Sequence, residues 1–201
     1  MRGAVLRLLL VVAMAGAAGC ERPASPVAEQ PVFQATDITG APWGRDFRLV
    51  DHAGQLRTLA DFRGKVVALF FGYTHCPDVC PTTLSDFAAA IRELGADGDR
   101  VQVIFVTVDP ERDTPDLLAK YVPSFNPAFL GAMAPVGELA ALAKSFNVVY
   151  QKSSIKSSSS YLIDHSAGTY VFDPKGQLRL HVAYGTGPVA IAQDLRTLLA
   201  Q

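Results

Sequence analysis

Two apolar stretches limit what this chain can fold into. Residues 66–71 read VVALFF, and residues 101–108 read VQVIFVTV. Runs of this kind, rich in β-branched and aromatic side chains, are typical of strands that are covered on both faces of a sheet. Between them, residues 83–94 carry apolar side chains at the spacing of one helix face. The pattern predicts a strand–helix–strand unit at the centre of an α/β domain.

The segments on either side of this unit extend the same prediction. Alternation and turn residues indicate two hairpins, and helical periodicity indicates three more helices. These are a hairpin at 47–59, a helix that opens at Pro115 with Thr114 as its N-cap, a helix at 137–146, a hairpin at 169–182 and a helix at 188–199. Together they predict a thioredoxin-like mixed sheet flanked by helices, with an extra N-terminal hairpin.

Charge and cysteine content exclude two classes of protein. The net charge is −1 over 201 residues, so the chain lacks the basic surface of a nucleic-acid-binding protein. It has three cysteines, Cys20, Cys76 and Cys80, which are too few for a scaffold held by disulfides. Each cysteine therefore needs its own explanation.

The N-terminal residues explain the first cysteine. Residues 8–18 form an apolar run that suits a signal peptide and is shorter than the ~20 residues that span a bilayer. The run ends in AAGC, which resembles a bacterial lipoprotein signal and predicts lipidation of Cys20. A plain signal peptide and an uncleaved anchor are the alternatives. All three export the domain, and the first and third hold it at the membrane, facing the periplasm.

The predicted organisation has three parts. Residues 1–20 form the leader, and residues 21–46 form a tether and lead-in that is rich in Pro, Ala and Glu at its start. The folded part is expected from Phe47 to residue 201.

The segment GYTHCPDVCP, residues 72–81, holds the other two cysteines with three residues between them. It follows the first apolar strand and runs into the predicted helix. The partial positive charge at a helix N-terminus favours thiolate over thiol, so both sulfurs should be reactive. In a helical turn, a separation of four places Cys76 and Cys80 on one side. A working disulfide, a structural disulfide and a soft-metal site such as one for Cu(I) all remain open.

A third ligand would favour the metal site, and four histidines are candidates. His75 adjoins Cys76, where neighbouring side chains tend to point apart. His52 is expected in solvent at a hairpin tip, and His181 in a strand. His165 follows a Ser-rich stretch and is expected on a loop, a setting that often carries function.

Three acidic residues could act on such a site indirectly. Asp78 lies between the cysteines and could tune their basicity or cap the following helix; the cap is the expected role. Asp109 follows the second apolar strand, where open α/β sheets bind ligands; a local turn network, with Asp113 or Thr114 capping the next helix, is the alternative. Asp164 could orient its neighbour His165.

Three motifs, GYTHCPDVCPTTL, VTVDPERDTP and DHSAGTYVFDPKG, together resemble the Sco/SenC family of copper chaperones over residues 47–199. The resemblance implies that Cys76, Cys80 and His165 bind one copper ion, as Cu(I) or Cu(II). It further implies delivery of copper to the copper-accepting subunit of cytochrome c oxidase, for its dinuclear centre. Other periplasmic copper chaperones and thiol reductases would be further partners.

Two other activities use the same cysteines. A thiol–disulfide reductase would reduce the cysteines of the acceptor protein and would not need His165. A peroxidase-like enzyme would need a nearby arginine and threonine, whose geometry the sequence does not specify. The chaperone function itself needs no catalysis, because copper transfer is an exchange of ligands.

Overall fold

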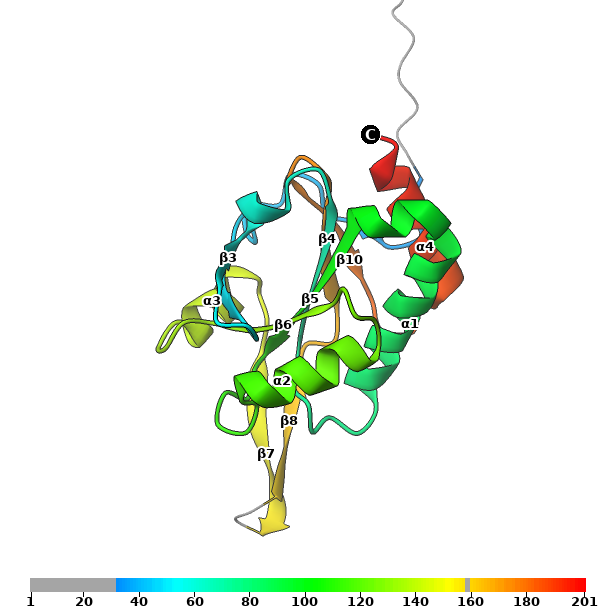
Figure 1. Cartoon of the computed structure of the whole chain (residues 1–201). Helices are drawn as coiled ribbons and strands as arrows, with labels where there is room; N and C mark the ends of the chain where they lie inside the picture. The colour runs from blue at the N-terminus through cyan, green and yellow to red at the C-terminus, as the bar shows by residue number, and fades with distance from the viewer. Residues whose placement is uncertain (1–31, 158–159) are drawn as a thin grey trace, which may run out of the picture. The chain divides into compact units, whose positions relative to one another are not determined.

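The computed structural model describes residues 32–157 and 160–201. An eight-stranded sheet has the order β1-β10-β9-β4-β5-β6-β2-β3, and β7 and β8 form a separate two-stranded sheet (Figure 1). The elements are β1 (Thr36–Asp37), β2 (Arg48–Asp51), β3 (Leu56–Thr58), η1 (Leu59–Phe62), β4 (Val66–Gly72), α1 (Val79–Leu94), η2 (Gly95–Arg100), β5 (Val101–Thr107), α2 (Pro115–Tyr121), η3 (Val122–Ser124), β6 (Leu130–Met133), α3 (Leu139–Ser145), β7 (Tyr150–Ser157), β8 (Ser160–His165), β9 (Thr169–Phe172), β10 (Leu178–Val182) and α4 (Pro188–Leu199).

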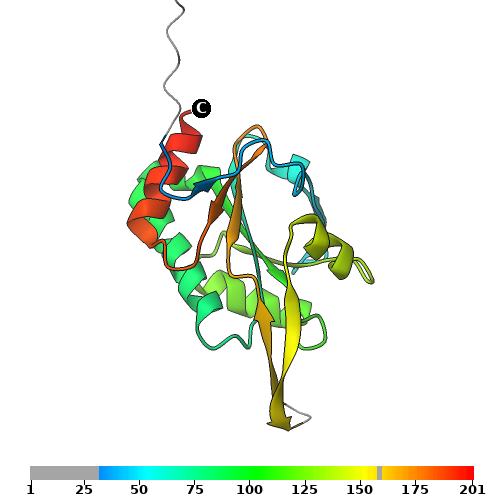
Figure 2. The same ribbon diagram turned by 180° about the vertical axis from the view of Figure 1, so that it is seen from behind.

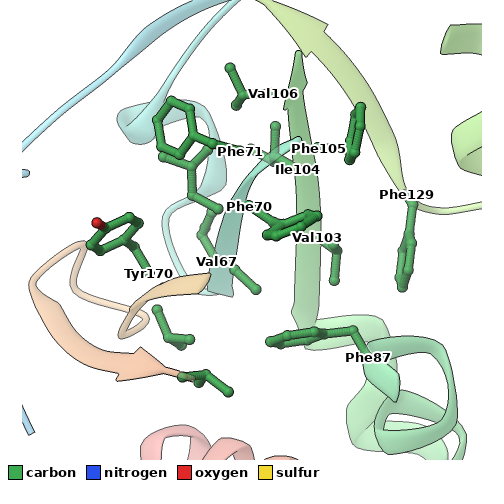
Figure 3. Packing of buried hydrophobic residues seen from close by; sticks show 14 of the residues in the cluster. Val67, Phe70, Phe71, Phe87, Val103, Ile104, Phe105, Val106, Phe129 and Tyr170 are labelled. Carbon is green, nitrogen blue, oxygen red and sulfur yellow. The ribbon is translucent and has the colours of Figure 1, made fainter. Parts of the chain in front are cut away.

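The two apolar stretches form the central strands, as predicted. β4 and β5 are parallel, with Phe70 opposite Phe105, and every residue of both strands is buried. Because side chains alternate across a strand, Phe70 and Phe71 face opposite layers. Phe70 packs against Phe105, whereas Phe71 packs against Phe146. Figure 3 shows the aromatic side chains gathered around these strands.

Helices cover the sheet on the side of Phe70. α1 and α4 lie side by side in both views (Figures 1 and 2). α2 packs on β6, where Leu118 lies against Gly131. The predicted thioredoxin-like mixed sheet flanked by helices is confirmed, and β2 and β3 form the predicted N-terminal hairpin.

The Ser-rich stretch before His165 differs from the prediction. It was expected to be a loop, yet β7 and β8 pair antiparallel there, with Tyr150 opposite His165. This hairpin lies outside the main sheet, and among the β8 side chains that the structure describes, residues 161–165, only Ile163 is buried. Pairing between backbone groups leaves no pattern of apolar side chains from which these two strands could be predicted. His165 therefore stands at the end of a strand and not on a loop.

The main sheet includes residues that precede Phe47. β1 pairs with β10, where Thr36 lies opposite His181. Just before β1, the backbone N–H groups of Gln34 and Ala35 donate to the carboxylate of Asp194 on α4, at 2.7 and 2.8 Å. Asp194 is only 2% exposed, so these two donors satisfy a buried charge.

These contacts predict the effect of shortening the chain. A chain that begins at Phe47 should lose about 1–3 kcal/mol of unfolding free energy relative to one that begins at Val32, because the Asp194 carboxylate loses its donors. Urea denaturation of the two chains measures the difference. In an Asp194→Ala background the same truncation should cost less, and an equal cost there would contradict the explanation.

The predicted leader, the lipidation residue Cys20 and most of the tether lie outside the described residues. Within residues 32–157 and 160–201, no helix has the length and apolar character needed to cross a bilayer.

Candidate metal centre

The two cysteines lie where β4 leads into α1. Gly72 ends the strand, Cys76 lies in the connecting loop, and Cys80 is the second residue of the helix. The backbone N–H of Cys80 donates to the Cys76 sulfur at 3.4 Å. Cys80 is fully buried and Cys76 is partly exposed. The loop therefore folds both sulfurs toward one point, and no disulfide joins them.

His165 reaches the same point from β8. Its Nε2 atom lies 3.4 Å from the Cys80 sulfur. The imidazole stands edge-on to the rings of Phe70 and Tyr73, with centroids 6.1 and 5.8 Å away. These aromatic walls hold the ring in one orientation. Both sulfurs and one His165 nitrogen lie within 4.8 Å of one another.

The other imidazole nitrogen identifies the tautomer. The Nδ1 atom of His165 lies 3.0 Å from the carbonyl oxygen of Ser166. A carbonyl only accepts hydrogen bonds, so Nδ1 carries the proton and Nε2 presents its lone pair to the sulfurs. A histidine that binds a metal is commonly arranged in this way.

The pKa values of the two thiols are shifted in opposite directions. A hydrogen bond from Cys80, together with those from the backbone N–H groups of Asp78 and Cys80, lowers the pKa of Cys76 to about 3. The same Cys80–Cys76 hydrogen bond, together with burial, raises the pKa of Cys80. At neutral pH the pair thus holds one thiolate, on Cys76, and one proton, on Cys80. A metal ion that binds both sulfurs must displace that proton.

This inequality predicts selective alkylation. Iodoacetamide should modify Cys76 of the reduced chain at a rate nearly independent of pH between about pH 5 and 8, because the thiolate is fully formed above a pKa of about 3. Cys80 should stay unmodified. Mass spectrometry after timed quenching measures both sites. In Cys80→Ala the donor to Cys76 is gone, and the rate should fall as the pH is lowered. A steep pH dependence in the native chain would contradict the assignment.

Asp78 occupies the N-cap position of α1 through its backbone, since its carbonyl accepts from the N–H of Thr82. Its carboxylate makes no capping bond to the helix; it lies 3.4 Å from the Thr82 hydroxyl and 3.5 Å from that of Tyr184. The prediction that this side chain caps the helix is therefore wrong, because the carboxylate points to these hydroxyls at the surface.

The other two acidic candidates lie apart from the donor atoms. Asp109 is buried, pairs with Arg112 and accepts from the Tyr161 hydroxyl at 2.7 Å. Asp164 is exposed, on the opposite side of β8 from His165. The partner of the His165 Nδ1 atom is the Ser166 carbonyl and not Asp164.

The remaining histidines are separate from the site. His75 is half exposed, with Nδ1 at 3.8 Å from Asp113. His181 is partly buried in β10 beside Tyr170. His52 was expected in solvent, but its Nδ1 accepts the backbone N–H of Gly131 at 3.0 Å. That prediction is wrong because the tip of the β2–β3 hairpin lies against β6.

Sequence reasoning missed the residue that braces the cysteine loop. Asp113 is fully buried and accepts from the backbone and the hydroxyl of Thr74, at 3.0 and 2.6 Å, and from the hydroxyl of Thr107 at 2.6 Å. The sequence pattern suggests only a helix cap for Asp113, a role that Thr114 fills. Its place in DPERDTP, directly after a buried strand, was the available signal.

The arrangement favours a soft metal ion. Two sulfurs and an imidazole nitrogen converge from three directions, and thiolate ligands select ions such as Cu(I). The same two sulfurs are also close enough to be oxidised to a disulfide after a small movement.

Comparisons with known proteins agree with this geometry. The chain is 42% identical to the bovine protein SCO2 homolog, mitochondrial, over 157 residues, which is 77% of this chain and 59% of the relative. It thus spans about three fifths of that relative's length. The human homolog of the same name is 41% identical, over 77% of this chain and 59% of its own.

Solved structures show the same fold. Bradyrhizobium japonicum ScoI with copper bound is 38% identical, with a TM-score of 0.69, over 76% of this chain and 97% of that one. Apo Sco1 from Thermus thermophilus is 40% identical, with a TM-score of 0.72, over 83% of this chain and 97% of that one. The SCO1/SenC family model matches residues 35–200. The chain belongs to the SCO1/SenC family.

Proposed function

We propose that this protein is a copper metallochaperone that binds one copper ion through Cys76, Cys80 and His165. The observation that carries the proposal is the convergence of two sulfurs and one imidazole nitrogen within 4.8 Å. A similar structure, that of Bradyrhizobium japonicum ScoI, was solved with copper bound.

The donor set fits copper in both oxidation states. With both thiols deprotonated, the two sulfurs and Nε2 provide three soft or borderline donors for Cu(I). A water molecule would be the fourth ligand that Cu(II) needs for a tetragonal site. Because Cys76 is partly exposed while Cys80 is buried, an incoming ligand would reach the ion from the Cys76 side.

Copper would leave by exchange of ligands with an acceptor. Membership of the SCO1/SenC family supports the copper-accepting subunit of cytochrome c oxidase as that acceptor, for assembly of its dinuclear centre. Oxidation of Cys76 and Cys80 to a disulfide removes two ligands and would release the ion. Other copper chaperones would supply copper, and thiol reductases would restore the thiols.

The proposal also includes a place in the cell. Residues 1–20 would direct export, and lipidation of Cys20 would hold the domain at a bacterial cell membrane, facing the periplasm. Residues 21–46 would be the tether and lead-in, the latter joined to the main sheet through β1, and residues 47–201 would make up the rest of the thioredoxin-like copper-binding part. Mass spectrometry of the membrane-extracted protein tests the lipid on Cys20 directly.

One observation favours a second function. The hydrogen bonds that lower the pKa of Cys76 to about 3 create a thiolate beside a protonated thiol, which suits a thiol–disulfide reductase. Such an enzyme would reduce the acceptor's cysteines before copper is loaded. The two functions differ in their need for His165.

Copper titration of the reduced chain from Pro23 onward tests the proposal. Absorption and EPR spectra report thiolate–Cu(II) bonds, and a competing chelator measures Cu(I) affinity. We expect one equivalent to bind tightly and to be lost in the Cys76→Ser/Cys80→Ser variant. Weak copper binding, or copper binding that survives this double substitution, would contradict the chaperone function and favour the thiol–disulfide reductase.

A further inference from the structure

Among the three candidate ligands, His165 is the one that comes from the separate β7–β8 sheet. β7 and β8 form their own two-stranded sheet, and both views show the hairpin projecting from the body of the domain (Figures 1 and 2). The cysteines, in contrast, lie in the loop after β4 (Cys76) and in the first turn of α1 (Cys80). The distance from His165 to the sulfurs therefore depends on whatever attaches the hairpin to the rest of the domain.

One arginine makes two contacts to the hairpin directly. Arg112, in the loop between β5 and α2, donates from Nη1 to the backbone carbonyl of Tyr161 at 2.9 Å. Its guanidinium carbon lies 3.6 Å from the centroid of the Tyr161 ring. Arg112 also pairs with Asp109, which accepts from the Tyr161 hydroxyl at 2.7 Å. We call these three residues, Asp109, Arg112 and Tyr161, the Arg112 clamp.

The clamp is shielded from water. Asp109 is 1% exposed and the side chain of Arg112 is 20% exposed. Screening is weak at such burial, so this ion pair is stronger than a surface pair. The ion pair that joins the hairpin directly to this loop, between Lys152 and Glu111, has side chains that are 49% and 66% exposed and contributes little.

A second contact holds β8 between the Arg112 clamp and His165. Along β8, Tyr161, Ile163 and His165 share one side of the strand. The backbone N–H of Ile163 donates to the hydroxyl of Tyr73 at 3.2 Å, and Ile163 is 4% exposed. Tyr73 belongs to the cysteine loop, and its ring also stands edge-on to His165. On this side of β8, Tyr161 thus contacts the rest of the clamp, Ile163 contacts the cysteine loop, and His165 faces the sulfur of Cys80.

We propose that Arg112 is a positioning residue, which holds β8 through Tyr161 and Asp109 so that His165 faces Cys80. It does not touch the metal; it acts only through His165. The copper readout of this proposal rests on the proposed function, whereas the position of the hairpin is measured without metal.

The test uses three variants of the full-length chain. Arg112→Ala removes the clamp, and Tyr161→Phe removes only the hydroxyl contact to Asp109. Arg112→Lys keeps the charge but loses the planar stacking and the fork of donors. Arg196→Ala is the matched control, because Arg196 also joins two elements through a backbone carbonyl, that of Glu93 at 2.9 Å, away from the hairpin.

The first readout is amide hydrogen exchange of Ile163 in the reduced, metal-free chain. Exchange should become at least about tenfold faster in Arg112→Ala, and less so in Tyr161→Phe, because the hairpin opens locally when the clamp is lost. Arg112→Lys should restore only part of the protection. Arg196→Ala should leave Ile163 unchanged. Unaltered exchange in Arg112→Ala would overturn the proposal, whatever copper does.

The second readout separates positioning from general stability. Copper affinity should fall about 10- to 100-fold in Arg112→Ala, the usual effect of removing a group that orients a ligand. In a His165→Ala background the same change should cost nothing further, because the clamp acts only through that imidazole. Additive losses would overturn the proposal. If the native chain binds no copper, the proposed function fails. The amide exchange of Ile163 then tests by itself whether Arg112 holds β8 in place.

Discussion

Replacing His165 with alanine is expected to lower copper affinity by at least about 100-fold, more than the loss of a group that merely orients a ligand. The change leaves two sulfurs with no third donor, because Nε2 is the nitrogen that faces them, 3.4 Å from the Cys80 sulfur. Oxidation and reduction of Cys76 and Cys80 should continue, since both thiols remain. Chelator competition measures the affinity, and thiol quantification after mild oxidation measures the disulfide.

His75→Ala is the matched control for this prediction. His75 adjoins Cys76 in the sequence, yet its ring lies toward Asp113 and is half exposed. Its removal should leave copper affinity within about twofold of the native value, since surface changes away from a site have small effects. Equal losses in the two variants would mean that His165 is not a ligand. Unchanged affinity in His165→Ala would favour the reductase.

Gly72→Ala should displace the sulfur of Cys80, because the added β-carbon would lie too close to it. A β-carbon at position 72 would lie 2.8 Å from the Cys80 sulfur and 2.8 Å from the ring of Phe105. Neither neighbour has room, because both are buried. We expect a loss of about 1–3 kcal/mol of unfolding free energy, as for other overpacked cores. Copper affinity should also fall, because the sulfur of Cys80 must move away from His165.

Gly131→Ala separates the two effects of Gly72→Ala. Gly131 is also buried in the main sheet, and a β-carbon there would lie 2.9 Å from the β-carbon of Leu118. Its loss of stability should be similar, but the contact is to α2 and not to a cysteine. Urea denaturation and copper titration of both variants are the measurements. A matching fall in copper affinity in Gly131→Ala would show that reduced stability, and not displacement of Cys80, causes the effect.

The central strands and the helix between them were predictable, because buried segments are rich in apolar side chains. Residues 66–71 and 101–108 are buried, and most of their side chains are apolar, as that setting favours. The helix between them showed its buried face through the spacing of Leu84, Phe87 and Ile91. These elements follow from local pattern, so reading the sequence alone was sufficient.

The β7–β8 hairpin was not predictable in the same way. Its position depends on contacts across the chain, such as the one between Arg112 and the backbone of Tyr161, 49 residues apart. A Ser-rich strand outside the main sheet has no apolar period to reveal it. The three proposed ligands were nevertheless predicted, through the resemblance of three motifs to the Sco/SenC family. The Ser166 carbonyl that selects the tautomer of His165 was not, because every residue has such a carbonyl.

The strand order of the main sheet has a consequence for how the protein behaves at high concentration. Its outermost strands are β1, with two residues, and β3, with three. A short edge offers a neighbouring molecule few unpaired backbone groups, so it is a poor template for sheet growth between chains. The long, apolar strands β4 and β5 lie well inside these edges. The brevity of these edge strands therefore limits the growth of the main sheet from one molecule to the next.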